Sequence, residues 1–134
     1  MNKQWILGID IGGSGVRCLL VNTASGDTFN SACSGWEFPE APGTIAGFDI
    51  DLDRIWRHIG ETSQNVLAKA GINGDSVMSV AVSAIRFGTV IVDKDGSPLF
   101  AVPTRDARAA GEFLELAEAE GDDILKDTGC WPLP

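Results

Sequence analysis

A glycine-rich loop between two short hydrophobic segments is the feature that most limits how this chain can fold. The loop spans Gly12 to Gly15, follows the apolar segment Trp5–Ile11 and precedes a second one, Val16–Val21. Both segments are rich in β-branched and aliphatic residues, which predicts two strands joined as a hairpin. A P-loop and a dinucleotide-binding turn both need a helix after their glycines, and a P-loop also needs a lysine. Both nucleotide folds are therefore excluded.

A third strand and a long helix are predicted next. The turn Ser25-Gly26-Asp27 leads into a strand over Thr28–Ser34, and the prolines and glycines between Gly35 and Asp49 predict an irregular connection. Apolar residues then recur every three or four positions from Leu52 to Ala70, which is typical of an amphipathic helix. Its start can be capped by Asp49 or Asp51, and Gly71 is its predicted stop.

The second half of the chain predicts three strands and another helix. The strands are Ser76–Ala84, Gly88–Val92 and an edge strand Pro98–Val102, with a hairpin turn at residues 93–96 between the last two. The helix is expected from about Asp106 to Glu120, with Gly121 as its stop. Strands followed by helical crossovers indicate an α/β fold with a mixed β-sheet and flanking helices.

Composition excludes several classes of function. A chain of 134 residues with 44% hydrophobic residues can form one folding unit or a piece of a larger one. Its net charge of −9 argues against a general nucleic-acid binder, and no segment could span a membrane. Three cysteines without metal-binding spacing are expected as reduced thiols packed like small hydrophobic residues, so we expect a cytoplasmic protein. The lone histidine, His58, lies off the apolar face of its helix and is expected at the surface.

The glycine loop and its flanks are the first candidate site. Glycines can adopt positive φ and approach a ligand closely, so that successive backbone N–H groups converge on phosphate oxygens. Ser14 can add a hydroxyl donor, and Asp10 at the strand end can hold a hydrated Mg²⁺. Arg17 either adds positive charge or points to solvent. The alternative is an ordinary glycine-rich hairpin with no ligand.

A calcium loop is excluded at the start of the first helix. Asp49, Asp51 and Asp53 have the alternate spacing of such a loop, but Arg54 occupies its glycine position and Gly60 its final glutamate position.

Four stretches, in order along the chain, carry a family resemblance. The segment from Gly8 to Arg17 resembles the first phosphate motif of the superfamily of sugar kinases, hexokinase, heat-shock protein 70 and actin. Residues 80–93 resemble the strand, substrate turn and strand of the FGGY carbohydrate kinases, the group of glycerol kinase, xylulokinase and gluconokinase. Residues 103–108 resemble the Trp-x-Asp-x-Arg segment of that family. Thr128-Gly129 resembles the turn that precedes the next helix of the family. The double glycine is also similar to a bacterial repressor and glucokinase family, but the later motifs favour the FGGY group.

The resemblance implies a fold and a set of site residues. The fold would be a ribonuclease H-like, actin-like ATPase domain, here residues 1–134 as a partial N-terminal FGGY kinase domain. ATP and Mg²⁺ are the implied cofactors, with Asp10 helping to coordinate the metal. The phosphates would be bound by Gly12, Gly13, Ser14, Gly15 and Arg17, and the substrate by Arg86, Phe87, Asp106 and Arg108.

Two positions depart from the family pattern. Phe87 stands where glycerol kinase has a glutamate, which puts glycerol in doubt as the substrate, and Thr104 stands where the family has a tryptophan. Without the resemblance, Arg86 could be a solvated turn residue, and Asp106 with Arg108 could cap and pair at a helix start.

The implied activity is transfer of the ATP γ-phosphate to a hydroxyl of a sugar or polyol. The resemblance puts the catalytic base beyond residue 134, so the 134-residue chain alone is expected to be inactive. The alternative is a non-catalytic actin-like nucleotide-binding or assembly module. The expected partner is a small-molecule substrate, with no nucleic acid and no membrane, and homodimer formation stays open.

Overall fold

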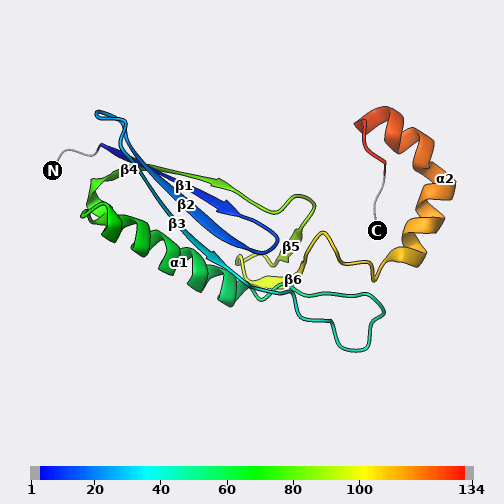
Figure 1. Cartoon of the computed structure of the whole chain (residues 1–134). Coiled ribbons are helices and arrows are strands. Elements are labelled where there is room, and N and C mark those ends of the chain that lie inside the picture. Colours follow the sequence, from blue (N-terminus) through cyan, green and yellow to red (C-terminus); the bar gives the residue numbers. More distant parts are fainter. Residues whose placement is uncertain (1–3, 132–134) are drawn as a thin grey trace. The chain divides into compact units, whose positions relative to one another are not determined.

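The structure, a computed structural model, describes residues 4–131, and these form two compact units (Figure 1). The first unit comprises the chain up to Glu37 and Asp51–Phe87, and the second comprises Phe38–Ile50 and the chain from Gly88 onward. The first unit contains β1 (Trp5–Ile11), β2 (Gly15–Asn22), β3 (Thr28–Ser34), α1 (Leu52–Lys69), a 3₁₀ turn (Gly74–Ser76) and β4 (Val77–Ser83). The second contains β5 (Thr89–Val92), β6 (Pro98–Val102) and α2 (Ala110–Thr128).

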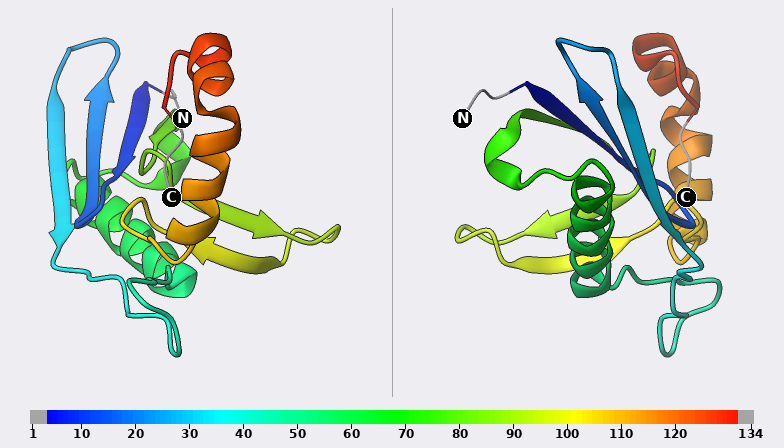
Figure 2. Two further views of the ribbon diagram at one scale, coloured as in Figure 1. Left: turned by 90° about the vertical axis from the view of Figure 1, so that its right-hand side faces the viewer. Right: turned by 60° about the vertical axis from the view of Figure 1, so that its left-hand side comes forward.

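The first unit is a four-stranded sheet with a helix on one face. The strand order is β3-β2-β1-β4, in which β1, β2 and β3 form an antiparallel meander and β4 runs parallel to β1. Helix α1 makes the crossover from β3 to β4 and packs along the sheet (Figure 2). A parallel neighbour requires such a crossover. The predicted mixed sheet is therefore confirmed.

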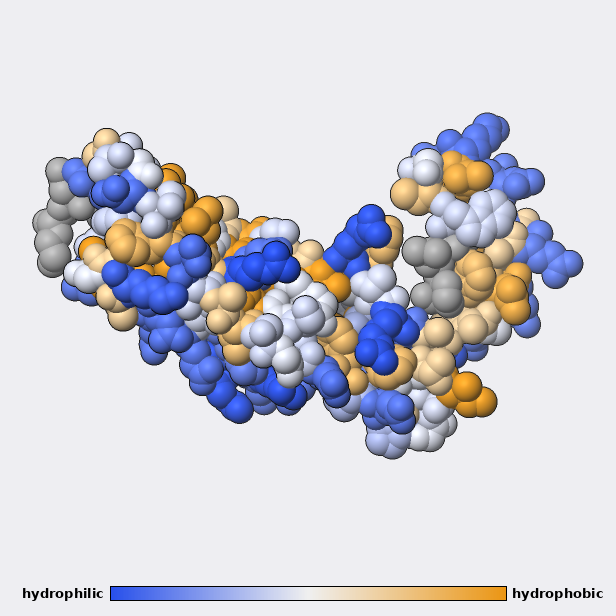
Figure 3. Space-filling model, viewed as in Figure 1, coloured by the Kyte–Doolittle hydropathy of each residue, from blue (hydrophilic) through white to orange (hydrophobic). Residues whose placement is uncertain are grey.

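The core lies between α1 and the sheet. Leu7 on β1, Val16 and Leu20 on β2 and Val66 on α1 are buried, and the last three have no exposed surface. Alternate residues of a strand point to opposite faces, so the intervening Leu19 is about half exposed. Figure 3 shows hydrophilic residues along the outer side of α1, opposite the core.

The two ends of α1 match the sequence signals. The Asp51 carboxylate accepts a hydrogen bond from the Arg54 backbone N–H at 2.9 Å, so Asp51 rather than Asp49 caps the helix. Gly71 has a φ of 67°, the left-handed conformation that ends a helix at low cost. Among the described residues no helix is long and apolar enough to cross a membrane.

Two cysteines and His58 do not lie where the sequence predicted. Cys18 is buried as expected, but Cys130 is exposed and Cys33 is only partly buried. The His58 side chain is 21% exposed, because it packs toward the sheet edge and contacts the indole ring of Trp36 with 5.8 Å between ring centroids. The prediction of a surface histidine was wrong, because helical periodicity alone does not show how wide the packed face is.

In the second unit, β5 and β6 form the predicted hairpin. The Asp93 carboxylate accepts hydrogen bonds from the backbone N–H groups of Asp95 and Ser97, at 2.9 and 2.8 Å, and so fixes the turn. The two strands are antiparallel and form a sheet of their own.

The bounds predicted for α2 were wrong at both ends. The helix begins at Ala110 rather than near Asp106, because the Asp106 carboxylate is bonded within a turn and to Phe48. It continues through Gly121, which is buried because the Trp131 ring lies where a side chain would be. The helix ends at Gly129, whose φ is 71°.

Replacing Thr62 by valine is expected to stabilise the first unit by about 1 kcal/mol. The Thr62 hydroxyl is buried on α1 and has no hydrogen-bond partner among the described residues. Valine keeps the shape of the side chain and removes the unsatisfied group. Urea unfolding followed by far-UV circular dichroism measures the change. Thr62→Ser keeps the hydroxyl and loses the methyl group, so it should destabilise; a Thr62→Val variant less stable than the parent would contradict the argument.

Candidate functional site

The turn between β1 and β2 leaves two backbone N–H groups for a ligand. The Gly12 N–H donates to the Gly15 carbonyl oxygen at 2.8 Å and closes the turn. The Ser14 carbonyl accepts from the Gly35 N–H at 3.0 Å, which ties the turn to the chain just after β3. Within residues 4–131 the N–H groups of Gly13 and Ser14 have no protein acceptor, and both residues are exposed. These two groups can donate to a phosphate.

Glycine is needed at position 15 of the turn for a reason that the sequence did not reveal. Gly12, Gly13 and Gly15 do not have positive φ, so the predicted conformational reason was wrong. At Gly15 the reason is space, because a Cβ there would overlap the carbonyl oxygen of Cys33 and lie 2.8 Å from the Cα of Ser34. Strand β3 therefore packs directly against the start of β2.

Asp10 and Arg17 lie opposite each other on β1 and β2. Their side chains form a long ion pair of 3.8 Å, with the Asp10 side chain 47% exposed and that of Arg17 72% exposed. Exposed pairs of this kind contribute little stability, so both groups stay available to a ligand. The Arg17 side chain is therefore largely exposed but lies near the Asp10 carboxylate.

An open groove of about 520 Å³ runs beside this pair. Its polar lining includes Asp10, Arg17, Asn30 on β3 and Ser83 at the end of β4. In the register of the sheet, Asp10 is paired with both Arg17 and Ser83. The groove thus extends from the strand ends beside the turn across β1, β2, β3 and β4 of the first unit.

Asp10 can hold a magnesium ion in a partly hydrated form. Mg²⁺ is bound in proteins by one or two carboxylates together with water and substrate phosphates. No group of three or more metal-binding side chains occurs within the described chain, so Asp10 would supply a single carboxylate. Its half-exposed position beside the turn fits that coordination.

The turn after β4 carries Arg86 and Phe87. Phe87 has a φ of 59°, which is rare for a bulky residue, and its ring is 53% exposed. The Arg86 guanidinium lies over that ring, 4.9 Å from its centroid. Strained backbone of this kind is common where a side chain must be held for a ligand.

In the second unit, Asp106 and Arg108 form a bonded network. The Asp106 carboxylate accepts from Arg108 Nε at 2.7 Å and from the Phe48 N–H at 2.6 Å. Arg108 also donates to the Phe48 carbonyl and to the Asp49 carboxylate, both at 2.7 Å. The pair therefore fastens the loop around residue 48 to the start of the α2 region.

The network fixes the charge of Asp106. Burial alone would raise the pKa of Asp106, but the hydrogen bond from the Phe48 N–H and the hydrogen bonds and charge of Arg108 outweigh it, so that the pKa is lowered from 3.8. The hydrogen bonds that Arg108 donates to the carboxylates of Asp49 and Asp106 raise the pKa of Arg108. Asp106 is thus an anion bonded to its neighbours rather than a proton acceptor at neutral pH.

The candidate residues fall into three local groups. Asp10 and Arg17 contact each other beside the turn between β1 and β2, Arg86 contacts Phe87, and Asp106 contacts Arg108. The first two groups belong to the first unit and the third to the second.

Sequence reasoning missed several residues of these groups. Asp49 was considered as a helix cap and in an excluded calcium loop, but not as the partner of Arg108 that its carboxylate is. Arg105 stacks on Phe48 at 3.8 Å from the ring centroid, and no motif indicated it. Ser83 could have been found, because it lies near the end of the predicted strand Ser76–Ala84.

A family comparison matches nearly the whole chain. The N-terminal domain of the FGGY family of carbohydrate kinases matches residues 5–132. Autoinducer-2 kinase of Escherichia coli (strain K12) is 26% identical over 132 residues, which are 96% of this chain and 25% of that protein. Autoinducer-2 kinase of Enterobacter sp. (strain 638) is 28% identical over 115 residues, which are 86% of this chain and 22% of that protein.

Solved structures share the fold. Gluconate kinase from Lactobacillus acidophilus gives a TM-score of 0.75 at 16% identity, with 94% of this chain and 25% of that one covered. Plasmodium falciparum glycerol kinase with ADP gives 0.72 at 19% identity, with 97% and 26% covered. Xylulose kinase from the same Lactobacillus gives 0.72 at 15%, with 91% and 24% covered.

The mixed sheet, its crossover helix and the turn after β1 define an actin-like ATPase fold of the carbohydrate kinase type. The chain belongs to the FGGY family of carbohydrate kinases, and its residues 5–132 match the N-terminal domain of that family. It spans about a quarter of the length of the curated relatives that it matches. The predicted family and fold are confirmed.

Gly15→Ala is expected to destabilise the first unit by about 2 kcal/mol, because the added Cβ meets backbone atoms of β3 that cannot move independently. Gly13→Ala is the matched control, since nothing lies within 4 Å of its Cβ position. Urea denaturation compares the two variants. Equal stability of the two would show that the packing of β3 does not constrain the turn.

The Asp106 carboxyl group is expected to titrate below 3.8 in the folded protein. Because its pKa is lowered on folding, its stabilising effect is complete above the unfolded value and is lost as the pH falls through the folded value. The Phe48 amide resonance, followed by NMR during acid titration, reports the change directly. Arg108→Gln should move the midpoint upward, whereas an unchanged midpoint in that variant would contradict the assigned cause.

Proposed function

We propose that the protein carrying this chain transfers the γ-phosphate of ATP to a hydroxyl group of a sugar or polyol. The match of the FGGY N-terminal domain to residues 5–132 is the observation that carries the proposal. An exposed turn with two available N–H groups beside a half-exposed carboxylate supports it, because phosphoryl transfer depends on positioned phosphates and a metal that offsets their charge.

Within this proposal the first unit supplies the phosphate and metal contacts. The N–H groups of Gly13 and Ser14 bind phosphate oxygens, Asp10 holds the hydrated Mg²⁺, and Arg17 adds positive charge at the groove. Gly12 and Gly15 contribute by shaping the turn, since the Gly12 N–H is already bonded to the Gly15 carbonyl. Magnesium supplies charge stabilisation for the transferring phosphoryl group when it is bound.

The substrate contacts are proposed at two of the local groups, each considered by itself. Arg86 is proposed to donate hydrogen bonds to substrate hydroxyls, and the Phe87 ring beneath its guanidinium restricts the orientations of that group. Asp106 and Arg108 are proposed to bind other substrate hydroxyls. They would use the carboxylate lone pairs and guanidinium N–H groups that are not engaged in the bond between the two side chains. The catalytic base is assigned to residues beyond this chain, and cytoplasmic location and homodimer formation stay predictions.

The substrate is best sought among the compounds named for the relatives. A coupled ADP assay of the full-length protein with autoinducer-2, gluconate, xylulose and glycerol tests the class. Turnover with one of the first three and little with glycerol is expected, because Phe87 has no carboxylate to accept a glycerol hydroxyl. Nucleotide binding without turnover on any sugar or polyol would favour the alternative, a non-catalytic actin-like module.

Asp10→Asn in the full-length protein is expected to lower kcat by at least about a hundredfold, because the metal loses its carboxylate. Asp53→Asn, which removes the same charge from an exposed position on α1, is the matched control and should keep full activity. Arg86→Ala should act chiefly on KM for the sugar. An Asp10→Asn enzyme with parental kcat at saturating Mg²⁺ would overturn the role of Asp10.

A further inference from the structure

On the face of the sheet that α1 covers, the first unit places a thiol against an imidazole. Cys33 lies on β3 and His58 on the first half of α1, with 3.0 Å between Cys33 Sγ and His58 Nδ1. The two residues are 25 positions apart in sequence, so the contact is made by the packing of α1 on the sheet. Cys33 is partly exposed, and the His58 side chain is 21% exposed.

The fold fixes both partners of this pair. Cys33 is paired with Val16 in the register of β2 and β3, which puts its side chain on the face that α1 covers, at the edge strand of the sheet. The buried indole of Trp36 packs on the imidazole, with 5.8 Å between ring centroids. The imidazole is thereby held toward the sulfur.

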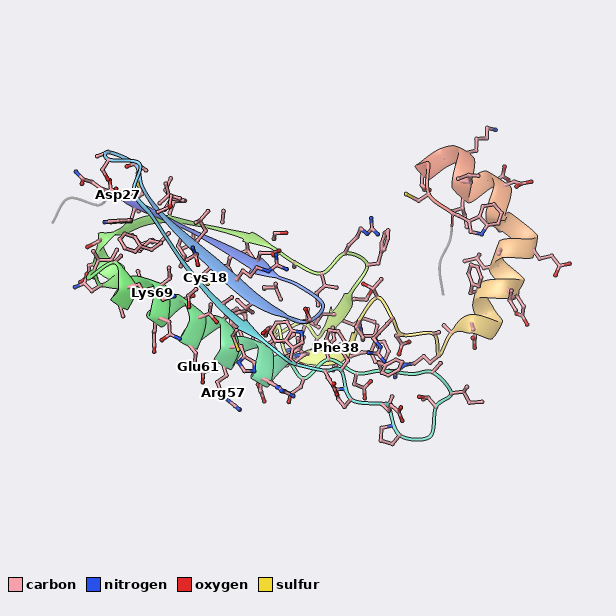
Figure 4. All side chains as sticks on the ribbon, in the orientation of Figure 1. Cys18, Asp27, Phe38, Arg57, Glu61 and Lys69 are labelled. Atoms are coloured by element: carbon pink, nitrogen blue, oxygen red, sulfur yellow. The ribbon has the colours of Figure 1, made fainter. Side chains whose placement is uncertain are left out.

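A carboxylate lies near the same ring nitrogen of His58. Glu61 lies one helical turn after His58, and its carboxylate is 3.6 Å from His58 Nδ1. The Glu61 side chain is 56% exposed, so it lies at the solvent side of the pair. Figure 4 shows Arg57 and Glu61 on the outer side of α1, with Cys18 on the side of the sheet that faces the helix.

The chemistry of a thiol beside an imidazole is that of an activated nucleophile. The thiolate rather than the thiol attacks an electrophile, and a base within hydrogen-bond reach of the sulfur can accept its proton as it reacts. His58 in its Nε2–H tautomer presents Nδ1 as the acceptor. The distance of 3.0 Å is within the reach that such proton transfer requires.

We propose that Cys33 is a modification site at which His58 assists exchange with small-molecule disulfides. The Cys33 thiol proton passes to His58 Nδ1, and the sulfur forms a bond with one sulfur of the disulfide. The S–S bond of the small molecule breaks, and its other half leaves as a thiolate that takes up the proton. One disulfide is consumed, a mixed disulfide forms at Cys33 and one small thiol is released, so the exchange needs no further oxidant.

The other two cysteines provide internal references. Burial raises the pKa of the Cys18 thiol, although its hydrogen bond with Ser63 lowers it in part, so this thiol is expected to be inert. Cys130 is exposed on the second unit, after the end of α2. Simple access to solvent would therefore make Cys130 the fastest of the three, whereas assistance by His58 reverses the order of Cys33 and Cys130.

The order of the rates tests the proposal. The full chain is incubated with glutathione disulfide near neutral pH, and the mixed disulfide at each cysteine is followed by peptide mass spectrometry. Cys33 is expected to react at least about tenfold faster than Cys130, within the range that positioned base catalysis supplies. In urea the two rates should become equal, because the pair then no longer exists. A folded Cys33 that reacts no faster than Cys130 would overturn the proposal.

A variant series separates assistance from access. His58→Gln keeps a polar side chain and cannot take the proton, so the Cys33 rate should fall at least about tenfold. Arg57→Gln, on the outer side of the same helix, is the matched control and should leave the rate unchanged. Circular dichroism verifies that both variants are folded. A folded His58→Gln protein with the parental Cys33 rate would refute the role of His58, and if that variant does not fold, the comparison of Cys33 with Cys130 decides. Neither readout depends on the proposed kinase activity.

Discussion

The contact between β2 and α1 determines most of the first unit. Val16 and Leu20 are buried under the helix beside Val66, and the alternation of side chains along a strand then forces Arg17 to the opposite face. There it meets Asp10 and helps to line the groove. The same two-residue period thus places the hydrophobic core on one side of the sheet and the polar candidate residues on the other, and a shift of one residue would exchange them.

Local patterns were enough to predict the strands and the first helix. The segment Thr28–Ser34 was predicted with the bounds that the structure has, and Gly71 ends α1 as expected. The errors arose where a contact with a residue far away in the sequence determines the bounds of an element. The start of α2 depends on a bond between Asp106 and the Phe48 N–H, 58 positions apart, and Gly121 lies inside the helix where the Trp131 ring occupies the place of a side chain. Neither contact leaves a signal in the neighbouring sequence.

The candidate site was predictable as residue types but only partly as geometry. The spacing of β1 and β2 around the turn was sufficient to bring Asp10 opposite Arg17. The requirement for glycine at position 15 was not predictable, since it comes from the Cys33 carbonyl on the next strand. The thiol and imidazole pair was missed for a similar reason. Periodicity identified the apolar face of α1, whereas the partner of His58 is set by how β3 passes beneath the helix.

The order of strands in the first unit has a consequence for folding. The meander β1, β2 and β3 uses short connections, so its pairs can form early, and the turn acquires its final shape once β3 packs against Gly15. Strand β4 is different, because its parallel pairing with β1 closes a long loop that includes α1. Ser83, at the end of β4, is thus the last of the polar residues lining the groove to take its place during folding. During synthesis the growing chain therefore contains the turn between β1 and β2 before the groove beside that turn can form.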